Sequence, residues 1–129
     1  MSETIFVLDA SALLVMLQGE EGAGCVYDTL ADARISAVNL SEVAAKLQER
    51  GVPDEVIDES LFELDLQVVP FDQAQAMAAG KLRASTRQHG LSLGDRACLA
   101  LTASLDGTAI TADRAWQKLD VSIRVQLVR

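Results

Sequence analysis

The sequence is poor in the residues that disulfide-rich, zinc-binding and disordered proteins need. Its 129 residues include two Cys, one His and two Pro. A single His and two widely separated Cys make a zinc site improbable. Few Pro and an apolar content of one half exclude disordered and collagen-like classes. The chain length is that of one domain, and no linker or repeat divides it.

Signals for export and for membrane insertion are missing as well. No apolar run approaches the ~20 residues that a membrane helix needs. The first four residues, MSET, carry an acid where a signal peptide carries bases. Cys25 and Cys98 lie among apolar neighbours, which is typical of buried free thiols in a reducing compartment, although spacing alone leaves a disulfide open. We therefore expect a cytoplasmic protein without a membrane segment.

The charge balance at first argues against a nucleic-acid partner, because the net charge is −8. The charges are distributed unevenly, however. Residues 1–80 hold three bases and 15 acids, whereas residues 81–129 hold eight bases and four acids. This asymmetry permits a local phosphate-binding surface on an acidic body, with ordinary solvated charge as the alternative. With three Phe, one Tyr and one Trp, the chain has little material for stacking nucleobases.

Short β-branched and apolar runs alternate with longer helical stretches along the whole chain. The predicted strands are residues 4–8, 34–38, 66–69, 108–111 and 122–128. The predicted helices are residues 10–18, 20–33, 39–50, 53–64, 72–88, 92–105 and 115–119. Strands joined by helices imply right-handed crossovers, so we predict a single α/β domain with a mainly parallel central sheet and helices on both faces.

Four acids are placed to meet at one edge of this sheet. Asp9 and Asp113 directly follow strands, Glu42 follows the second strand by four residues, and Asp95 begins the longest apolar helix. In open parallel sheets the ligand site lies beyond the carboxyl ends of the strands. Clustered carboxylates repel one another unless a cation lies between them, and oxygen ligands favour Mg²⁺ or Mn²⁺. We predict a divalent-metal site.

Helix capping is the alternative explanation for each acid. Asp9 and Asp113 stand where N-caps are found, and residues 39–42 and 92–95 both fit capping boxes. A non-catalytic binding module whose acids only cap helices therefore remains open.

The segments around these acids resemble those of the PIN-domain ribonucleases, in particular the small VapC-type toxins of toxin-antitoxin pairs. The resemblance runs nearly end to end, over the segments FVLDASAL (6–13), ISAVNLSEV (35–43), LSLGDRACLA (91–100) and TADRAW (111–116). The third of these is the most specific. The resemblance implies that residues 1–129 form a PIN domain in which Asp9, Glu42, Asp95 and Asp113 bind one or two Mg²⁺ or Mn²⁺ ions.

The same resemblance implies an endoribonuclease that cuts RNA, often tRNA or ribosomal RNA, and is inactivated by a cognate VapB-type antitoxin. A divalent ion would lower the pKa of a bound water and neutralise charge on the phosphate. Homodimers are usual in the family, with the antitoxin bound along an apolar groove. Residues 12–17 and 56–64 are candidates for that surface, and core packing is the competing use of those side chains. A PIN nuclease of RNA processing or DNA repair is the alternative within the enzyme class.

Four further residues adjoin the candidate ligands. Ser11 and Thr111 are candidates to orient a ligand carboxylate or a water, or are plain strand-end hydroxyls. Arg96 and Arg114 either contact RNA phosphate or pair with the acids. Some relatives carry an additional acid shortly after the fourth ligand, but residues 114–118 here contain none. A second metal is therefore expected to bind weakly or only with substrate.

Overall fold

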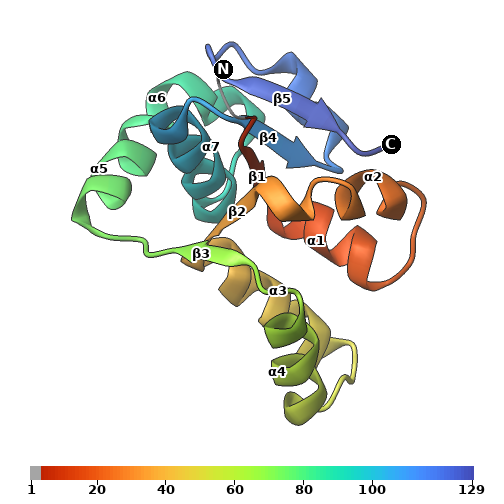
Figure 1. Ribbon diagram of the computed structural model, residues 1–129. Helices are drawn as coiled ribbons and strands as arrows, with labels where there is room; N and C mark the ends of the chain where they lie inside the picture. The colour runs from red at the N-terminus through yellow and green to blue at the C-terminus, as the bar shows by residue number, and fades with distance from the viewer. Residues whose placement is uncertain (1–3) are drawn as a thin grey trace.

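The computed structural model describes residues 4–129 and contains one five-stranded, all-parallel sheet (Figure 1). The strand order is β3-β2-β1-β4-β5. The strands are β1 (Phe6–Leu8), β2 (Ala33–Ser36), β3 (Gln67–Val69), β4 (Thr108–Thr111) and β5 (Arg124–Leu127). β1 lies in the centre, where Leu8 pairs in register with Ile35 of β2 and with Ile110 of β4. The predicted α/β class and parallel sheet are confirmed.

Helices follow the strands in the order the sequence predicts. They are α1 (Ala10–Leu17), α2 (Ala23–Tyr27), α3 (Ala37–Glu49), α4 (Asp54–Glu63), α5 (Gln73–Lys81), α6 (Arg83–Thr86) and α7 (Leu93–Leu105). Short 3₁₀ helices are η1 (Leu30–Asp32), η2 (Arg87–His89) and η3 (Arg114–Lys118). None of the helices within residues 4–129 has the length and apolarity that crossing a bilayer requires.

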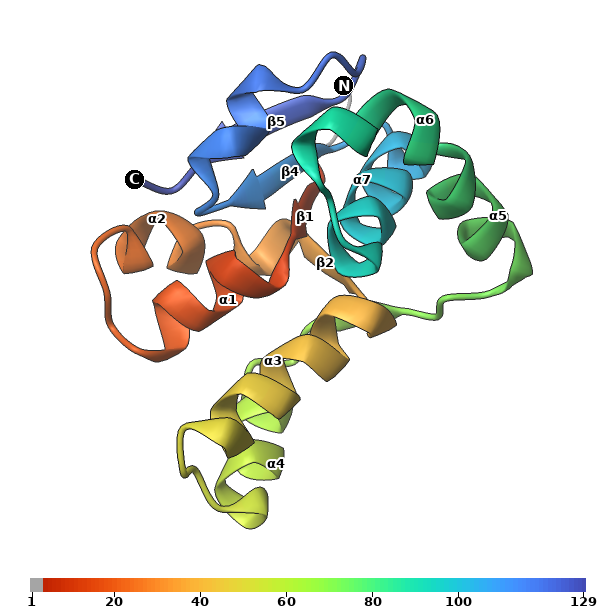
Figure 2. The same ribbon diagram turned by 180° about the vertical axis from the view of Figure 1, so that it is seen from behind.

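The sheet has a separate apolar core on each face, because successive strand residues point to opposite sides. Leu8 and Ile110 pack with α1 and α3, through buried residues such as Leu13 and Val43. Val7 belongs to the other core, with Leu99 of α7 and other buried side chains. Helices cover both faces, as predicted. Figure 2 shows α3 and α4 side by side, extending away from the sheet below β2.

Several predicted boundaries are wrong. The helix predicted over 20–33 contains only α2 and η1, and the helix predicted over 72–88 is divided into α5, α6 and η2. α3 begins at Ala37 instead of Asn39, because the Ser36 hydroxyl accepts a hydrogen bond from the Val38 amide and caps the helix. The second strand consequently ends at Ser36 instead of residue 38.

Candidate active site

Asp9 is a buried carboxylate at the carboxyl end of the central strand. It directly follows β1 and caps α1, where its Oδ1 accepts hydrogen bonds from the Ala12 amide at 2.8 Å and the Ser11 hydroxyl at 2.7 Å. Its Oδ2 accepts from the Thr111 hydroxyl at 2.5 Å. With 4% of its surface exposed, Asp9 is held in one orientation by three donors.

The two hydroxyls connect Asp9 to the segment that carries Asp113. Ser11 Oγ accepts from the Ala112 amide at 2.9 Å, and Thr111 Oγ1 accepts from the Asp113 amide at 3.0 Å. Each hydroxyl therefore donates to Asp9 and accepts from the backbone that follows β4. The Asp113 carboxylate itself caps η3 through the Ala115 amide.

Burial raises the pKa of Asp9 to about 6, and the charge of Asp95 adds to this shift. The hydrogen bonds from Thr111, Ala12 and Ser11 oppose it. The ordinary value is 3.8, so the ionised form of this carboxylate costs about 3 kcal/mol at neutral pH. A cation beside Asp9 would offset that cost.

Glu42 lies on the first turns of α3, where Asn39 orients it. Asn39 is buried, and its Nδ2 donates at 3.0 Å both to Glu42 Oε1 and to the Gly94 carbonyl of α7. A Cβ added at Gly94 would overlap both oxygens of the Glu42 carboxylate. Burial raises the pKa of Glu42, and the charge of Asp95 adds to the shift. The structure therefore brings α3 and α7 together at a glycine that leaves room for this acid.

Asp95 acts electrostatically on both Asp9 and Glu42, since its negative charge raises the pKa of each. Burial and then the charge of Asp9 raise the pKa of the buried Cys98 thiol, and Asp95 and Glu42 also contribute. Three of the four predicted acids thus act on one region at the start of α7. Asp95 also completes a capping box with Ser92, in which each accepts a bond from the other's backbone amide.

The sequence model of the PIN domain matches residues 6–122. The chain belongs to the PIN-domain family. The matched range includes all four acids and β1 to β4. Comparison with curated proteins finds no match.

Solved structures of PIN toxins share the fold over nearly the whole chain. The DNA-bound VapBC complex of Salmonella typhimurium matches at 17% identity with a TM-score of 0.77, covering 98% of this chain and 100% of that one. VapBC2 of Rickettsia felis, bound to promoter DNA, gives 15% identity and a TM-score of 0.74 over 96% and 98%. VapC20 of Mycobacterium tuberculosis, a toxin that cleaves the sarcin-ricin loop, matches at 16% identity with a TM-score of 0.70. The match covers 92% of this chain and 98% of that one.

The carboxylates of this PIN domain have the donor chemistry of a hard-cation site. Within residues 4–129, no three His, Cys, Asp or Glu side chains lie close enough together to hold a metal ion. The cap bonds engage Asp95 Oδ2 and Asp113 Oδ1, and in the described chain the other oxygen of each carboxylate has no partner. All the candidate ligand atoms are carboxylate oxygens, and the charge of Asp95 raises the pKa of both Asp9 and Glu42, so the chemistry of these residues fits Mg²⁺ or Mn²⁺.

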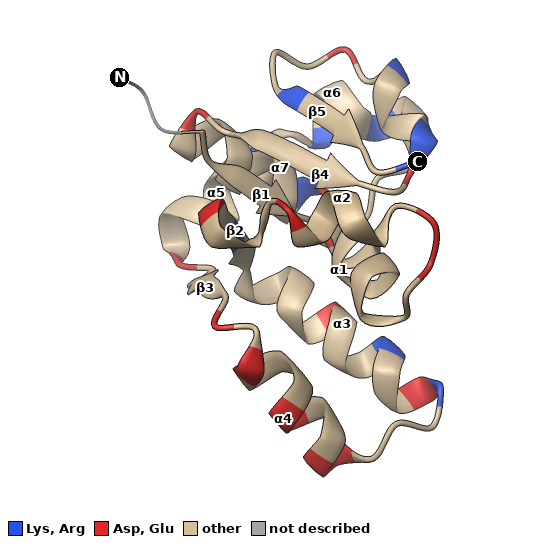
Figure 3. Ribbon diagram, turned by 45° about the vertical axis from the view of Figure 1, so that its right-hand side comes forward, with Lys and Arg blue, Asp and Glu red and all other residues tan. Residues whose placement is uncertain are grey.

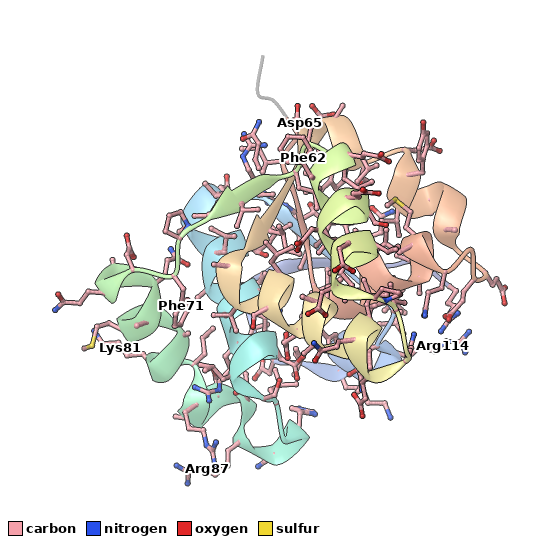
Figure 4. The ribbon with its side chains drawn as sticks, turned by 90° about the horizontal axis from the view of Figure 1, so that it is seen from below. Phe62, Asp65, Phe71, Lys81, Arg87 and Arg114 are labelled. Carbon is pink, nitrogen blue, oxygen red and sulfur yellow. The ribbon has the colours of Figure 1, made fainter. Side chains whose placement is uncertain are left out.

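The two candidate arginines differ in their surroundings. Arg96 is half-buried on α7, and its Nη1 donates to the Ala79 carbonyl of α5 at 3.1 Å. Arg114 is exposed at the start of η3 (Figure 4). Neither takes part in an ion pair within the described residues.

Figure 3 shows that acids line α4, whereas bases gather around α6, β5 and the C-terminus.

Asn39 and Gly94 are the two residues of the site that the sequence did not indicate. The capping box predicted for residues 39–42 is wrong, since Ser36 caps α3 and Asn39 lies in its first turn. An Asn three residues before an acid on a helix is the signal available for the Asn39 contact with Glu42. The Gly94 contact joins residues 55 apart and has no local signature.

The other predicted cap bonds, made by Asp9, Asp95 and Asp113, are confirmed.

The two apolar segments predicted for a partner surface have different exposures. In α1, Ala12, Leu13 and Val15 are buried in the core, so this segment has the packing role that we gave as the alternative. In α4, Ile57 is buried, but Phe62 is 86% exposed.

Both cysteines are free: Cys98 is fully buried, and Cys25 is half-buried.

Proposed function

We propose that this PIN domain is a metal-dependent endoribonuclease toxin of the VapC type. The observation that carries the proposal is the state of Asp9, a buried acid at the end of the central strand whose carboxylate accepts three hydrogen bonds. Burial raises its pKa to about 6, and the charge of Asp95 adds to the shift. A carboxylate with these properties is typical of a functional site. The shared fold of the VapBC complexes and of VapC20 supports the toxin class.

Asp9, Glu42, Asp95 and Asp113 would hold the ion, Mg²⁺ or Mn²⁺. When bound there, a divalent cation lowers the pKa of a coordinated water and neutralises charge on the scissile phosphate. Ser11 and Thr111 fix both oxygens of Asp9. Asn39 holds Glu42 toward α7, and exposed Arg114 beside Asp113 offers a guanidinium to an RNA phosphate.

RNA, of the tRNA or ribosomal class, is the proposed substrate, and a VapB-type antitoxin is the proposed inhibitor. We infer a homodimer that acts in the cytoplasm, where free thiols such as Cys25 and Cys98 persist. Residues 1–129 are proposed to work as one PIN domain, since β5 extends the sheet just past the matched range. A small antitoxin reading frame next to the gene would support the toxin assignment.

The test is RNA cleavage in the presence of Mg²⁺ or Mn²⁺, with the cut ends mapped after expression. Asp9→Asn and Asp95→Asn are each expected to abolish cleavage while the fold is retained. Asp58→Asn, which removes the same charge from an exposed position on α4, is the matched control and should cut like wild type. Wild-type rates in either site variant would refute the assignment of the site.

A non-catalytic module is the second candidate, because Asp9, Asp95 and Asp113 do accept cap bonds from backbone amides. Thermal melting separates the two. A ligand that binds only the folded state raises the melting temperature, so Mn²⁺ should stabilise the wild type and not Asp9→Asn. Equal melting with and without Mn²⁺ would favour the capping module.

A further inference from the structure

A recess opens beside Glu42, between the first turns of α3 and α7 and the loop that joins β3 to α5. Its volume is about 530 Å³, within the range of small-ligand sites. Ala37, Val38 and Ser41 of α3, Leu93 of α7 and Phe71 of the loop line it together with Glu42. Figure 4 shows Phe71 on this loop, just before α5.

The walls of the recess are mainly apolar, although it lies at the edge of an acidic site. Leu93 is the first residue of α7 and is 50% exposed, which is unusual for a large apolar side chain beside carboxylates. Phe71 is partly exposed and is the only aromatic residue in the described lining. Ser41 contributes an exposed hydroxyl. These groups offer an apolar contact surface and one hydroxyl.

We propose that this recess binds one unpaired nucleobase of the RNA, next to the phosphodiester bond that is cut. The inference rests on the proposed nuclease function and adds a subsite to it. A nucleobase has an apolar face that stacks on an aromatic ring and polar edges that hydrogen-bond to a hydroxyl or a carboxylate. Phe71 and Leu93 supply the contact for the face, and Ser41 supplies the polar contact.

Continuity with the proposed active site favours a nucleobase over a separate ligand. Glu42 both lines the recess and belongs to the acidic group around Asp95. A molecule whose phosphate lies at those acids therefore has its neighbouring base within reach of the recess. α3 and α7, each 13 residues long, both begin at the recess, and their N-termini favour the negative charge of the adjoining phosphates.

The experiment measures cleavage of a short single-stranded oligoribonucleotide that contains the mapped cut site, with Mn²⁺ present. Phe71→Leu keeps apolar volume and removes the aromatic face, whereas Phe71→Tyr keeps the ring. Because base stacking on an aromatic residue is typically worth tenfold or more in binding, Phe71→Leu should raise KM about tenfold with kcat nearly unchanged, and Phe71→Tyr should remain near wild type. Phe62→Leu, at an 86% exposed position on α4, is the matched control and should have no effect.

A second arm removes the base instead of the ring. For wild type, removing the base next to the cut should lower kcat/KM about tenfold. For Phe71→Leu, which has already lost the stacking contact, removing the same base should lower kcat/KM little further. Independent losses in the two arms would overturn the subsite, as would equal cleavage by wild type and Phe71→Leu. If Phe71→Leu cleaves normally but loses binding to the antitoxin, the recess belongs to a protein partner and the inference is wrong. Absence of any metal-dependent cleavage by wild type would instead refute the proposed function.

Discussion

The Thr111 hydroxyl donates to Asp9 Oδ2 at 2.5 Å, joining the ends of adjacent parallel strands across 102 residues of sequence. The oxygen of the Thr111 hydroxyl in turn accepts a hydrogen bond from the Asp113 amide. One hydroxyl thus sets the orientation of the first proposed ligand and the course of the backbone at the fourth.

Thr111→Val removes this hydroxyl while keeping the shape of the side chain. The bond from Thr111 lowers the pKa of Asp9, so its loss should raise that pKa further above about 6. The Asp113 amide also loses its acceptor, and we expect a loss of about 1–3 kcal/mol in the free energy of unfolding at pH 8. Urea denaturation of the metal-free protein measures it. Thr111→Ser should restore most of the stability, and a Val variant as stable as wild type would contradict this role.

Asp9→Asn should make the metal-free protein more stable at pH 8, although it abolishes cleavage. The folded-state pKa of about 6 lies above the ordinary 3.8, so Asp9 favours folding below pH 3.8 and that contribution is lost as pH rises through 6. The neutral amide avoids the loss, and the expected gain is up to about 3 kcal/mol at pH 8 and near zero at pH 4. Denaturation curves at the two pH values check this, and a gain independent of pH would show that burial of the charge is not its cause.

The alternation of apolar runs was sufficient to predict the order of strands and helices along the chain and the parallel sheet that they form. β4 begins and ends at the predicted residues, 108 and 111, because a turn and an acid bound that short run. The start of α3 was missed because Ser36 and Asn39 are both good cap residues three positions apart, and only the fold decides between them.

Contacts between distant elements account for what the sequence did not reveal. Asn39 reaches the Gly94 carbonyl across 55 residues, and the close approach of α7 to Glu42 depends on the missing side chain at position 94. Neither relationship leaves a periodic or local signature. The recess beside Phe71 likewise forms from three segments that are separate in sequence, which is why a count of aromatics suggested no stacking surface.

Gly94→Ala should separate folding from activity. The added Cβ would overlap the Glu42 carboxylate, which lies at the end of a flexible side chain and is expected to swing away from Asn39. Ala is a better helix former than Gly, so the melting temperature should not fall, while cleavage should fall at least tenfold. Gly80→Ala on α5, where an added Cβ meets nothing within 4 Å, is the matched control. Equal activity of Gly94→Ala and Gly80→Ala would contradict a role for the Glu42 position.

Substitution by Gln should affect RNA binding at Arg114 and stability at Arg96. Arg114→Gln removes an exposed charge, so it should raise KM for RNA and reduce the slope of log KM against log salt by about 0.7–1, as expected for one phosphate contact. Arg96→Gln breaks the bond to the Ala79 carbonyl and should lower the free energy of unfolding by about 1–2 kcal/mol while leaving the salt slope unchanged. Cleavage kinetics over a salt series and urea denaturation of both variants provide the two readouts. If Arg96→Gln changes the salt slope and Arg114→Gln does not, Arg96 is the phosphate contact and Arg114 is a solvated surface charge.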